Sequence, residues 1–214
     1  KGWDENKLDM FRRHIIQLGT TGVFVIYDEL EGKEAVTWSY LLHTVELPME
    51  IQELTDEVKV IGKNKAGGVS VAHLFSSAKT EQAMVDTFFC APTNWKNVTN
   101  AQGKTLKYPN HWHFSSTTVP CKTARFLTVM DTHGKNRPDM QVVRKGNTIQ
   151  VGDWTITCNL TEKGKAAIYV SNKTEKVSLN YDAGKKEGAT IVTDQVKGKQ
   201  VTKVLIDYLP DFEI

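Results

Sequence analysis

Cysteine is scarce in this chain of 214 residues, which carries only Cys90, Cys121 and Cys158. The three lie far apart with no C-x-x-C spacing, and their odd number argues against a full disulfide framework, although one pair could form. A globular chain of this length buries roughly 70% of its unfolded surface. It therefore needs no disulfides to stabilise its core.

Long apolar runs are also missing. No stretch approaches the roughly 20 residues that a membrane-spanning helix requires, so we expect no membrane contact. No secretory signal peptide opens the chain, which starts abruptly at Lys1-Gly2-Trp3. This start leads us to expect either a processed protein or a piece of a longer one.

Charge of one sign does not dominate. The chain has 27 Lys and Arg against 25 Asp and Glu, a net charge of +2, and it contains no basic tract. Nucleic-acid binding therefore has no support. A hydrophobic fraction of 40% and a charged fraction of 24% are ordinary for globular proteins, which excludes collagen-like, coiled-coil and wholly disordered chains.

Self-sufficient catalytic motifs are absent as well. We find no Ser, Cys or Asp nucleophile motif, no glycine loop of the kind that cradles phosphate, and no H-E-x-x-H. The sequence by itself thus predicts no complete catalyst.

Short segments with β-type alternation, separated by Gly, Asn and Asp turns, dominate what is present. Segments 11–18 and 23–30 flank Gly19-Thr20-Thr21-Gly22 and predict a hairpin. Segment 36–43 is apolar on both faces, which is typical of an inner strand covered on both sides. Only 80–88 could form a short helix. Further strands are expected at 57–61, 69–75, 112–117, 124–130, 140–145, 148–151, 154–158, 166–171, 175–181, 189–193 and 200–206.

So many short strands at regular spacing predict an all-β fold, a stacked antiparallel β-sandwich. We expect a single domain over residues 1–214, with a weak subdivision near residue 135, where a His- and Trp-rich part gives way to a Lys-rich one. Residues 91–111 carry little strand signal. They predict a long polar loop, which is often functional or disordered.

The predicted first hairpin contains residues that could carry chemistry. Asp28 falls on an apolar strand face, where a carboxylate is costly unless it is paired or bound to a metal. A turn centred on Thr21 would place His14 directly opposite Asp28. The two could form an ordinary buried hydrogen-bonded pair, or they could join His43 around zinc or a similar divalent ion. A simple hairpin does not bring His43 to this place, so a third ligand there requires a change of sheet.

Several other side chains could contact a ligand. Arg12 and Arg13 could each grip a carboxylate or sulfate, but neighbouring side chains of a strand point to opposite faces. Trp95 and Trp112 could stack on sugar rings or pack in the core.

The remaining histidines are weaker candidates. His111 and His113 fall on one face of a predicted strand, where they could share a ligand or metal or lie partly exposed. We expect His73 to be a hydrogen-bonded core residue and His133 to be solvated.

Residues 11–44, FRRHIIQLGTTGVFVIYDELEGKEAVTWSYLLHT, carry a more specific pattern. A basic first strand, a turn, an aromatic and hydrophobic run closing in Asp-x-Leu, and then W-x-x-L-L-H follow in order. This stretch resembles the opening strands of the β-sandwich region in heparinase II/III-like polysaccharide lyases. The segments HWHFSS at 111–116 and ARFLTVM at 124–130 resemble paired strands near the middle of that sandwich. Beyond residue 131 the resemblance is compositional.

The resemblance implies an architecture and a metal. Members of the family join an N-terminal helical toroid to a C-terminal β-sandwich, with the active cleft between them. The sandwich holds a divalent metal, zinc by expectation, on a first-strand His, a second-strand Asp and a third-strand His. In this sequence those ligands would be His14, Asp28 and His43.

The resemblance also implies an activity, which is β-elimination on a polysaccharide containing uronic acid. The principal catalytic Tyr, His and Asn come from the toroid, which this chain lacks, so we expect it to be inactive alone. Some members carry a His where this chain has Arg12, which suggests contact with carboxylate or sulfate instead. The expected partners are an acidic polysaccharide and the toroid of the parent chain, in a periplasmic or secreted setting.

Two other functions stay open at this point. One is a stand-alone carbohydrate-binding or structural β-sandwich module, with Trp95 and Trp112 stacking on sugars. The other, an independent metal-dependent hydrolase, is less favoured because no base motif accompanies the three candidate ligands.

Overall fold

The computed structural model describes residues 7–45, 47–86, 99–104 and 111–184, together with the backbone of two further strands at 190–196 and 199–205. The chain divides into two compact units, Lys1–Asp139 and Met140–Ile214. The boundary lies close to residue 135, where the composition changes. The expectation of a single domain stays a prediction, and the units are described separately.

The predicted all-β fold is confirmed. The described residues form strands and turns without a helix, and the strands pair antiparallel in three sheets. Among these residues no helix is long and apolar enough to cross a membrane.

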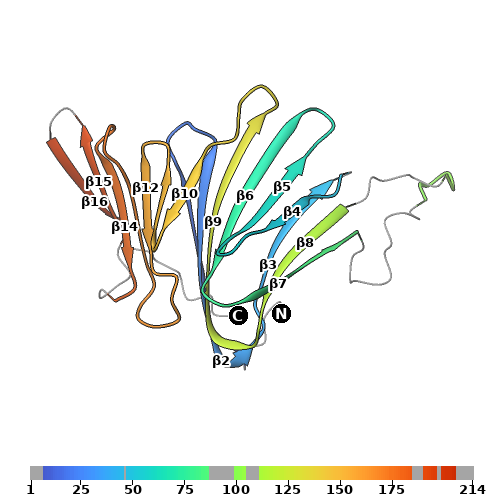
Figure 1. Cartoon of the computed structure of the whole chain (residues 1–214), viewed down its shortest axis with the longest axis horizontal. Coiled ribbons are helices and arrows are strands. Elements are labelled where there is room, and N and C mark those ends of the chain that lie inside the picture. The colour runs from blue at the N-terminus through green and yellow to red at the C-terminus, as the bar shows by residue number, and fades with distance from the viewer. Residues whose placement is uncertain are drawn as a thin grey trace. The chain divides into compact units, whose positions relative to one another are not determined.

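The first unit consists of a six-stranded and a three-stranded sheet (Figure 1). The six-stranded sheet has the order β1-β2-β9-β6-β5-β4, and the smaller sheet has the order β3-β8-β7. The strands are β1 (Leu8–Gln17), β2 (Val23–Val36), β3 (Ser39–Val45), β4 (Glu50–Glu53), β5 (Val58–Lys63), β6 (Gly68–Ser76), β7 (Thr80–Val85), β8 (His111–Thr118) and β9 (Cys121–Gly134).

Three connections between these sheets form a corner. Residues 37–38 lead from β2 into β3, residues 77–79 lead from β6 into β7, and residues 119–120 lead from β8 into β9. The order β2-β9-β6 in one sheet thus becomes β3-β8-β7 in the other. Strands that switch sheets at a bend are a known way to build a two-layer β structure, and Figure 1 shows β2 and β9 curving at this end.

Hydrogen bonds at the corner replace those that the sheet ladders lose there. The Trp38 backbone N–H donates to Thr118 Oγ1 over 3.0 Å, and the Thr118 N–H donates to the Trp38 carbonyl over 2.9 Å. The Trp38 indole Nε1 donates to the Cys121 carbonyl over 3.1 Å. Buried backbone polar groups require such partners, so these bonds fix where the strands leave the larger sheet.

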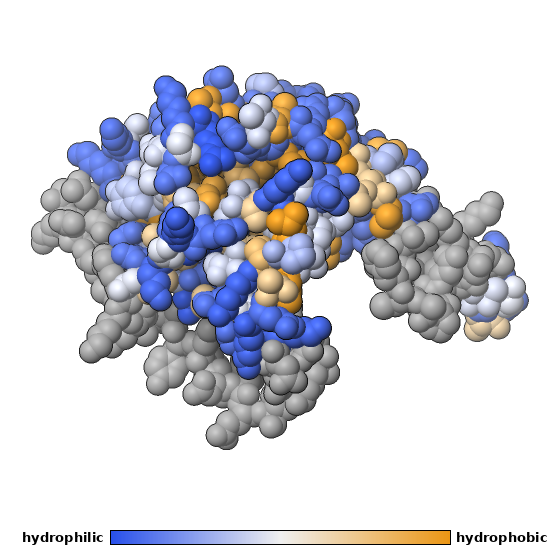
Figure 2. Space-filling model, turned by 60° about the horizontal axis from the view of Figure 1, so that its bottom comes forward, coloured by the Kyte–Doolittle hydropathy of each residue, from blue (hydrophilic) through white to orange (hydrophobic). Residues whose placement is uncertain are grey.

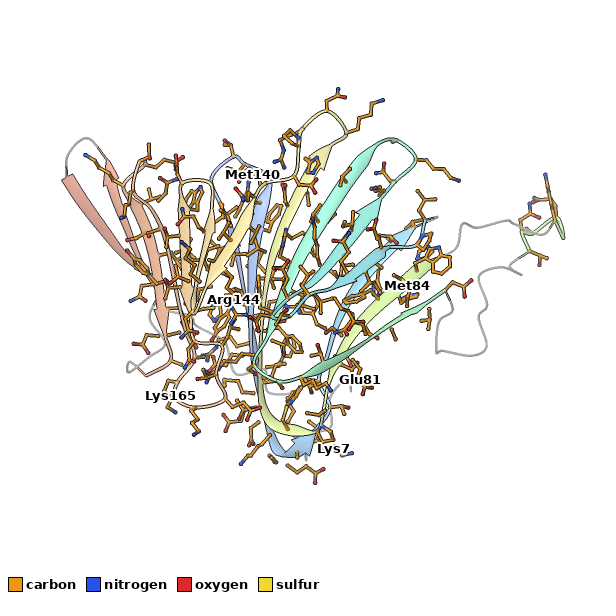
Figure 3. The ribbon with its side chains drawn as sticks, viewed as in Figure 1. Lys7, Glu81, Met84, Met140, Arg144 and Lys165 are labelled. Carbon is orange, nitrogen blue, oxygen red and sulfur yellow. The ribbon has the colours of Figure 1, made fainter. Side chains whose placement is uncertain are left out.

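The core of the first unit lies between its two sheets. Leu30, Phe126 and their neighbours on the larger sheet pack against Tyr40 and Phe114 of the smaller one. Met84 of β7 packs against the same cluster, whereas Glu81 of that strand is exposed (Figure 3). The buried members are Leu30, Trp38, Tyr40, Met49, Val60, Ala72, Leu74, Phe114, Ala124 and Phe126.

The second unit is a seven-stranded antiparallel sheet in which each strand pairs with the next one along the chain. The predicted tight hairpin is confirmed, since Lys145 pairs with Thr148 across the two-residue turn Gly146-Asn147. The strands are β10 (Val142–Lys145), β11 (Thr148–Val151), β12 (Trp154–Cys158), β13 (Ala167–Asn172), β14 (Val177–Asp182), β15 (Thr190–Val196) and β16 (Lys199–Leu205).

Two expectations about secondary structure are wrong. Residues 80–85 of the proposed helix 80–88 form β7, because every residue from Thr80 to Val85 pairs with β8. Segment 36–43 is no inner strand either. It spans the corner, and β3 lies at the edge of the smaller sheet with Leu41 and Val45 exposed.

The predicted long polar loop at 91–111 lies mostly outside the described residues.

On the face shown in Figure 2, hydrophobic residues are scattered among hydrophilic ones.

The corner hydrogen bonds make a prediction for stability. Thr118→Val keeps the shape of a buried side chain but leaves the Trp38 N–H without its acceptor, so we expect the free energy of unfolding to fall by about 1–3 kcal/mol. Thr117→Val removes a hydroxyl that bonds only to Ser39 at the exposed surface, and it should cost less than about 0.5 kcal/mol. Urea unfolding of both variants measures the difference, and equal losses would contradict the role given to Thr118.

Candidate functional site

The loop of the first hairpin sets the register of the residues that carry the predicted site. The Leu18 N–H donates to the Val23 carbonyl over 2.9 Å and closes a four-residue loop, 19–22. Gly22 has a φ of +78°, and a Cβ at this position would lie 2.6 Å from the Thr132 carbonyl oxygen. Only glycine fits this backbone and this close approach.

Because this loop has an even number of residues, its centre falls between two residues and not on Thr21. Arg13 therefore pairs with Asp28, and His14 pairs with Tyr27. The prediction that His14 lies opposite Asp28 is wrong by one residue. A slip of one residue moves a side chain to the other face of a sheet, so His14 and Asp28 point to opposite sides.

Asp28 is held by an arginine. Arg13 Nε and Nη2 lie 2.7 and 2.8 Å from the two carboxylate oxygens, and Asp28 is only 2% exposed. The hydrogen bond to Asp28 raises the pKa of the Arg13 guanidinium. A bidentate pair of this kind explains how a carboxylate is tolerated on the core face.

Tyr40 completes this interior group. The Arg13 guanidinium lies 5.5 Å from the centroid of the Tyr40 ring. Burial raises the pKa of the Tyr40 hydroxyl above its ordinary value, and the nearby Asp28 carboxylate raises it further. The nearby Thr128 hydroxyl and the Arg13 charge act in the opposite direction. The phenol therefore stays neutral beside the ion pair at physiological pH.

The three predicted metal ligands do not share a site. His14 lies on the face of the larger sheet that points away from the core of the first unit, Asp28 lies on the core side, and His43 lies on the outer face of the smaller sheet. Among the described residues no three His, Cys, Asp or Glu side chains are grouped so that they could hold a metal. The set His14, Asp28 and His43 thus does not fit zinc. The chain does pass to another sheet before His43, as expected for a third ligand, but this does not bring His43 to the other two residues.

Arg12 lies on the other face from Arg13, as strand alternation requires. It pairs with Glu29, and Glu29 in turn pairs with Arg125 of β9, so the three form one row across β1, β2 and β9. Arg12 Nη1 lies 3.6 Å from Glu29 Oε2. Glu29 and Arg125 are buried, whereas the side chain of Arg12 is 28% exposed.

Histidines gather on the exposed face of the smaller sheet. His43 pairs with His113, and the ring centroids are 4.5 Å apart. His111 falls on the same face, two residues along β8, as the sequence predicts. Burial lowers the pKa of His113, and repulsion from His43 and His111 lowers it further.

The two tryptophans predicted to bind sugar have different outcomes. Trp112 lies on the inner face of β8 and packs against the core, so it does not form an exposed stacking platform. Trp95 lies outside the described residues.

Two other histidine predictions can be checked. His73 is buried, and its Nδ1 lies 2.6 Å from Glu57 Oε1, which confirms a hydrogen-bonded core residue. His133 was expected to be solvated, but its side chain is only 4% exposed. Its Nδ1 lies 2.8 Å from the Gly134 carbonyl, and its Nε2 lies 3.2 Å from Asp139 Oδ1. That expectation is wrong, because the ring is buried and both of its nitrogens have partners.

Two adjoining cavities occur where the β5–β6 turn meets the end of β9. The larger, about 560 Å³, also touches the end of β3, and the smaller is about 430 Å³. Neither cavity can be predicted from the sequence, since their residues belong to turns and strand ends without a distinctive motif. The larger is lined by Thr44, Val45, Gly62, Lys63, Asn64, Gly68, Val69, Ser70, Thr132 and His133. The smaller is lined by Ala66, Gly67, Gly68, Gly134, Lys135, Asn136 and Arg137.

Comparison with known proteins adds no assignment: no family model matches the chain, and no curated protein matches it.

The Arg13–Asp28 pair predicts unequal effects of removing its two partners. Arg13→Leu leaves a carboxylate buried without its guanidinium, so we expect a loss of about 3 kcal/mol in the free energy of unfolding, the low end for breaking a buried pair. Asp28→Asn should cost less, because the side chain of Arg13 is 39% exposed and can turn toward water. Chemical denaturation measures both losses. A larger loss for Asp28→Asn would contradict this account.

The His113 pKa gives a prediction about pH. The unfolded chain, with a His pKa near 6.5, binds a proton at His113 more readily than the folded chain. The His113 contribution to stability therefore falls as the pH drops below about 6.5. NMR titration of the imidazoles should place His113 below 6.5. His43→Gln should raise the pKa of His113, but not as far as 6.5, because burial is the larger cause of the shift. An unchanged His113 pKa in this variant would contradict the assignment.

Proposed function

We propose that this chain is the β-sandwich portion of a heparinase II/III-like polysaccharide lyase and that it contacts the acidic polysaccharide without catalysing elimination alone. The residues that carry the resemblance, 11–44, make β1, β2, the corner and β3 in unbroken order. This agrees with the expected opening strands of such a sandwich. The all-β fold is also what the proposal requires.

The partial exposure of Arg12 is the observation that supports the proposal. Strand β1 lies at the edge of the larger sheet, and the side chain of Arg12 is 28% exposed there. Its contact with Glu29 is looser than the bidentate Arg13–Asp28 pair, at 3.6 Å against 2.7 Å. Arg125 of β9 lies in the same row, on the other side of Glu29. A uronate carboxylate or a sulfate of the substrate would meet the exposed part of the Arg12 side chain, since guanidinium groups form paired, charge-assisted hydrogen bonds with both anions.

The chemistry expected of this surface is binding and charge neutralisation. In β-elimination, neutralising the uronate carboxylate makes the C5 proton easier to remove, and a second group protonates the leaving glycosidic oxygen. Groups that transfer these protons must lie within hydrogen-bond reach of the sugar. The resemblance assigns them to the helical toroid, and Arg12 would hold an anionic group of the substrate.

The proposal predicts binding without turnover. The intact chain should bind heparin and alginate more tightly than neutral dextran in a fluorescence titration, and it should release no unsaturated uronate from either polymer. Arg12→Gln should weaken the binding about three- to tenfold, since it removes one charge-assisted contact. Arg144→Gln removes the same charge from the second unit and should leave the affinity unchanged.

Two results would overturn the proposed function. One is robust formation of unsaturated product by the chain alone, which would make it a complete enzyme. The other is equal affinity for dextran and the acidic polymers, which would remove the role of charge.

A further inference from the structure

The two cavities lie at one end of the first unit, apart from the Arg12 row. Three strands form the floor of the larger one, because Gly62, Ser70 and Thr132 follow one another across β5, β6 and β9. The end of β3 forms a wall. A Cβ at Gly62 would lie 2.9 Å from the Thr44 methyl carbon, so only glycine allows β3 to approach this closely.

The lining of the larger cavity suits a sugar. Thr44, Ser70 and Thr132 contribute hydroxyl groups, while Val45 and Val69 contribute apolar surface. The Thr44 hydroxyl donates to the Leu47 carbonyl and the Thr132 hydroxyl donates to the Gly22 carbonyl, so both oxygens can still accept a hydrogen bond from a ligand. Apolar walls with a few oriented polar groups are typical of ligand sites, and a volume of about 560 Å³ is ample for one sugar residue.

Charge selects an acidic sugar over a neutral one. Lys63 is exposed at the edge of the larger cavity and contributes a positively charged ammonium group to its lining. Lys135 and Arg137 stand in the smaller cavity, which adjoins the larger one at Gly68. Arg137 also pairs with the buried Asp131, which fixes the position of its guanidinium.

The turn between the cavities leaves the backbone accessible. Gly67 has a φ of +89°, which favours glycine, and a Cβ there would lie 3.1 Å from the Lys135 side chain. Asn64 closes the turn through its Oδ1, which accepts the Gly68 N–H over 2.8 Å. The cavities thus adjoin at Gly68 beside a short, exposed turn, over which a linear polymer could pass.

We propose that the two cavities are adjoining subsites for successive residues of an acidic polysaccharide. A uronate residue occupies the larger cavity with its carboxylate at Lys63, and the anionic group of the next residue meets Lys135 and Arg137. The substrate class rests on the proposed function, whereas the location rests on the cavities themselves.

The test uses the intact chain and two oligosaccharides, a heparan-type tetrasaccharide and a neutral cellotetraose. NMR titration of backbone amides should show the acidic tetrasaccharide shifting the signals of Ser70, Val69 and Thr132, with cellotetraose binding at least tenfold more weakly. Lys63→Gln and Lys135→Gln should each weaken the acidic ligand about five- to tenfold, and Ser70→Ala about two- to fivefold.

Lys59→Gln is the matched control. It removes the same charge from the same strand, and its side chain lies outside both cavities. Because Lys59 pairs with Asp139, which also contacts His133 of the larger cavity, the control is scored together with Lys79→Gln, an exposed lysine between β6 and β7; both should leave the affinity within about twofold. Thermal unfolding checks that each variant is folded. Lys63 and Lys135 are exposed, so replacing either should leave the melting temperature unchanged.

The outcomes separate this inference from the proposed function. If the tetrasaccharide binds but neither Lys63→Gln nor Lys135→Gln weakens it beyond the control, the subsites are wrong, and a loss in Arg12→Gln would still support the proposed function. Equal binding of cellotetraose overturns the acidic specificity of the cavities. If no acidic saccharide binds to the chain, both proposals fail.

Discussion

The corner at Trp38 and Thr118 is the constraint on which the first unit depends. Three strands leave the larger sheet there, and each loses ladder hydrogen bonds where it bends. The reciprocal bonds between Trp38 and Thr118 restore two of them within the buried region. Because the sheets share one core, the bend that these residues fix also sets which side chains of β3 and β8 point inward. The exposed histidine face and the inward, partly buried position of Trp112 both follow from it.

The alternation of charged residues along β1 depends on the same layering. Arg13 points toward the core side and is balanced by Asp28, whereas Arg12 points away and shares Glu29 with Arg125. The two neighbouring arginines therefore have different environments. Arg13 stabilises the interior, and Arg12 keeps some exposure at the sheet edge. Replacing either residue tests a different property of the protein.

The sequence predicted most strands because alternation and turn residues are local signals. The hairpin around Gly146-Asn147 shows this well, since a two-residue turn leaves only one register. The register of the first hairpin was harder to predict, because a turn centred on Thr21 and the four-residue loop 19–22 give strand registers that differ by one residue. That difference separated His14 from Asp28. The sheet to which β3 belongs could not be read from residues 36–43, since Trp38 finds its partners 80 residues away. The cavities are formed by β3, β5, β6 and β9 together, and no local sequence pattern indicates that these four strands come together.

The two units differ in how far apart in the chain their pairing partners lie. In the second unit each strand pairs with its neighbour in sequence, so its hairpins can form one after another with short loop closures. In the first unit β2 must find β9, and Trp38 must reach Thr118, across most of the unit. Closing such long loops costs entropy before any contact compensates for it, and folding rates fall as the mean separation of contacts grows. The corner that organises the first unit therefore also makes that unit the slower of the two to fold.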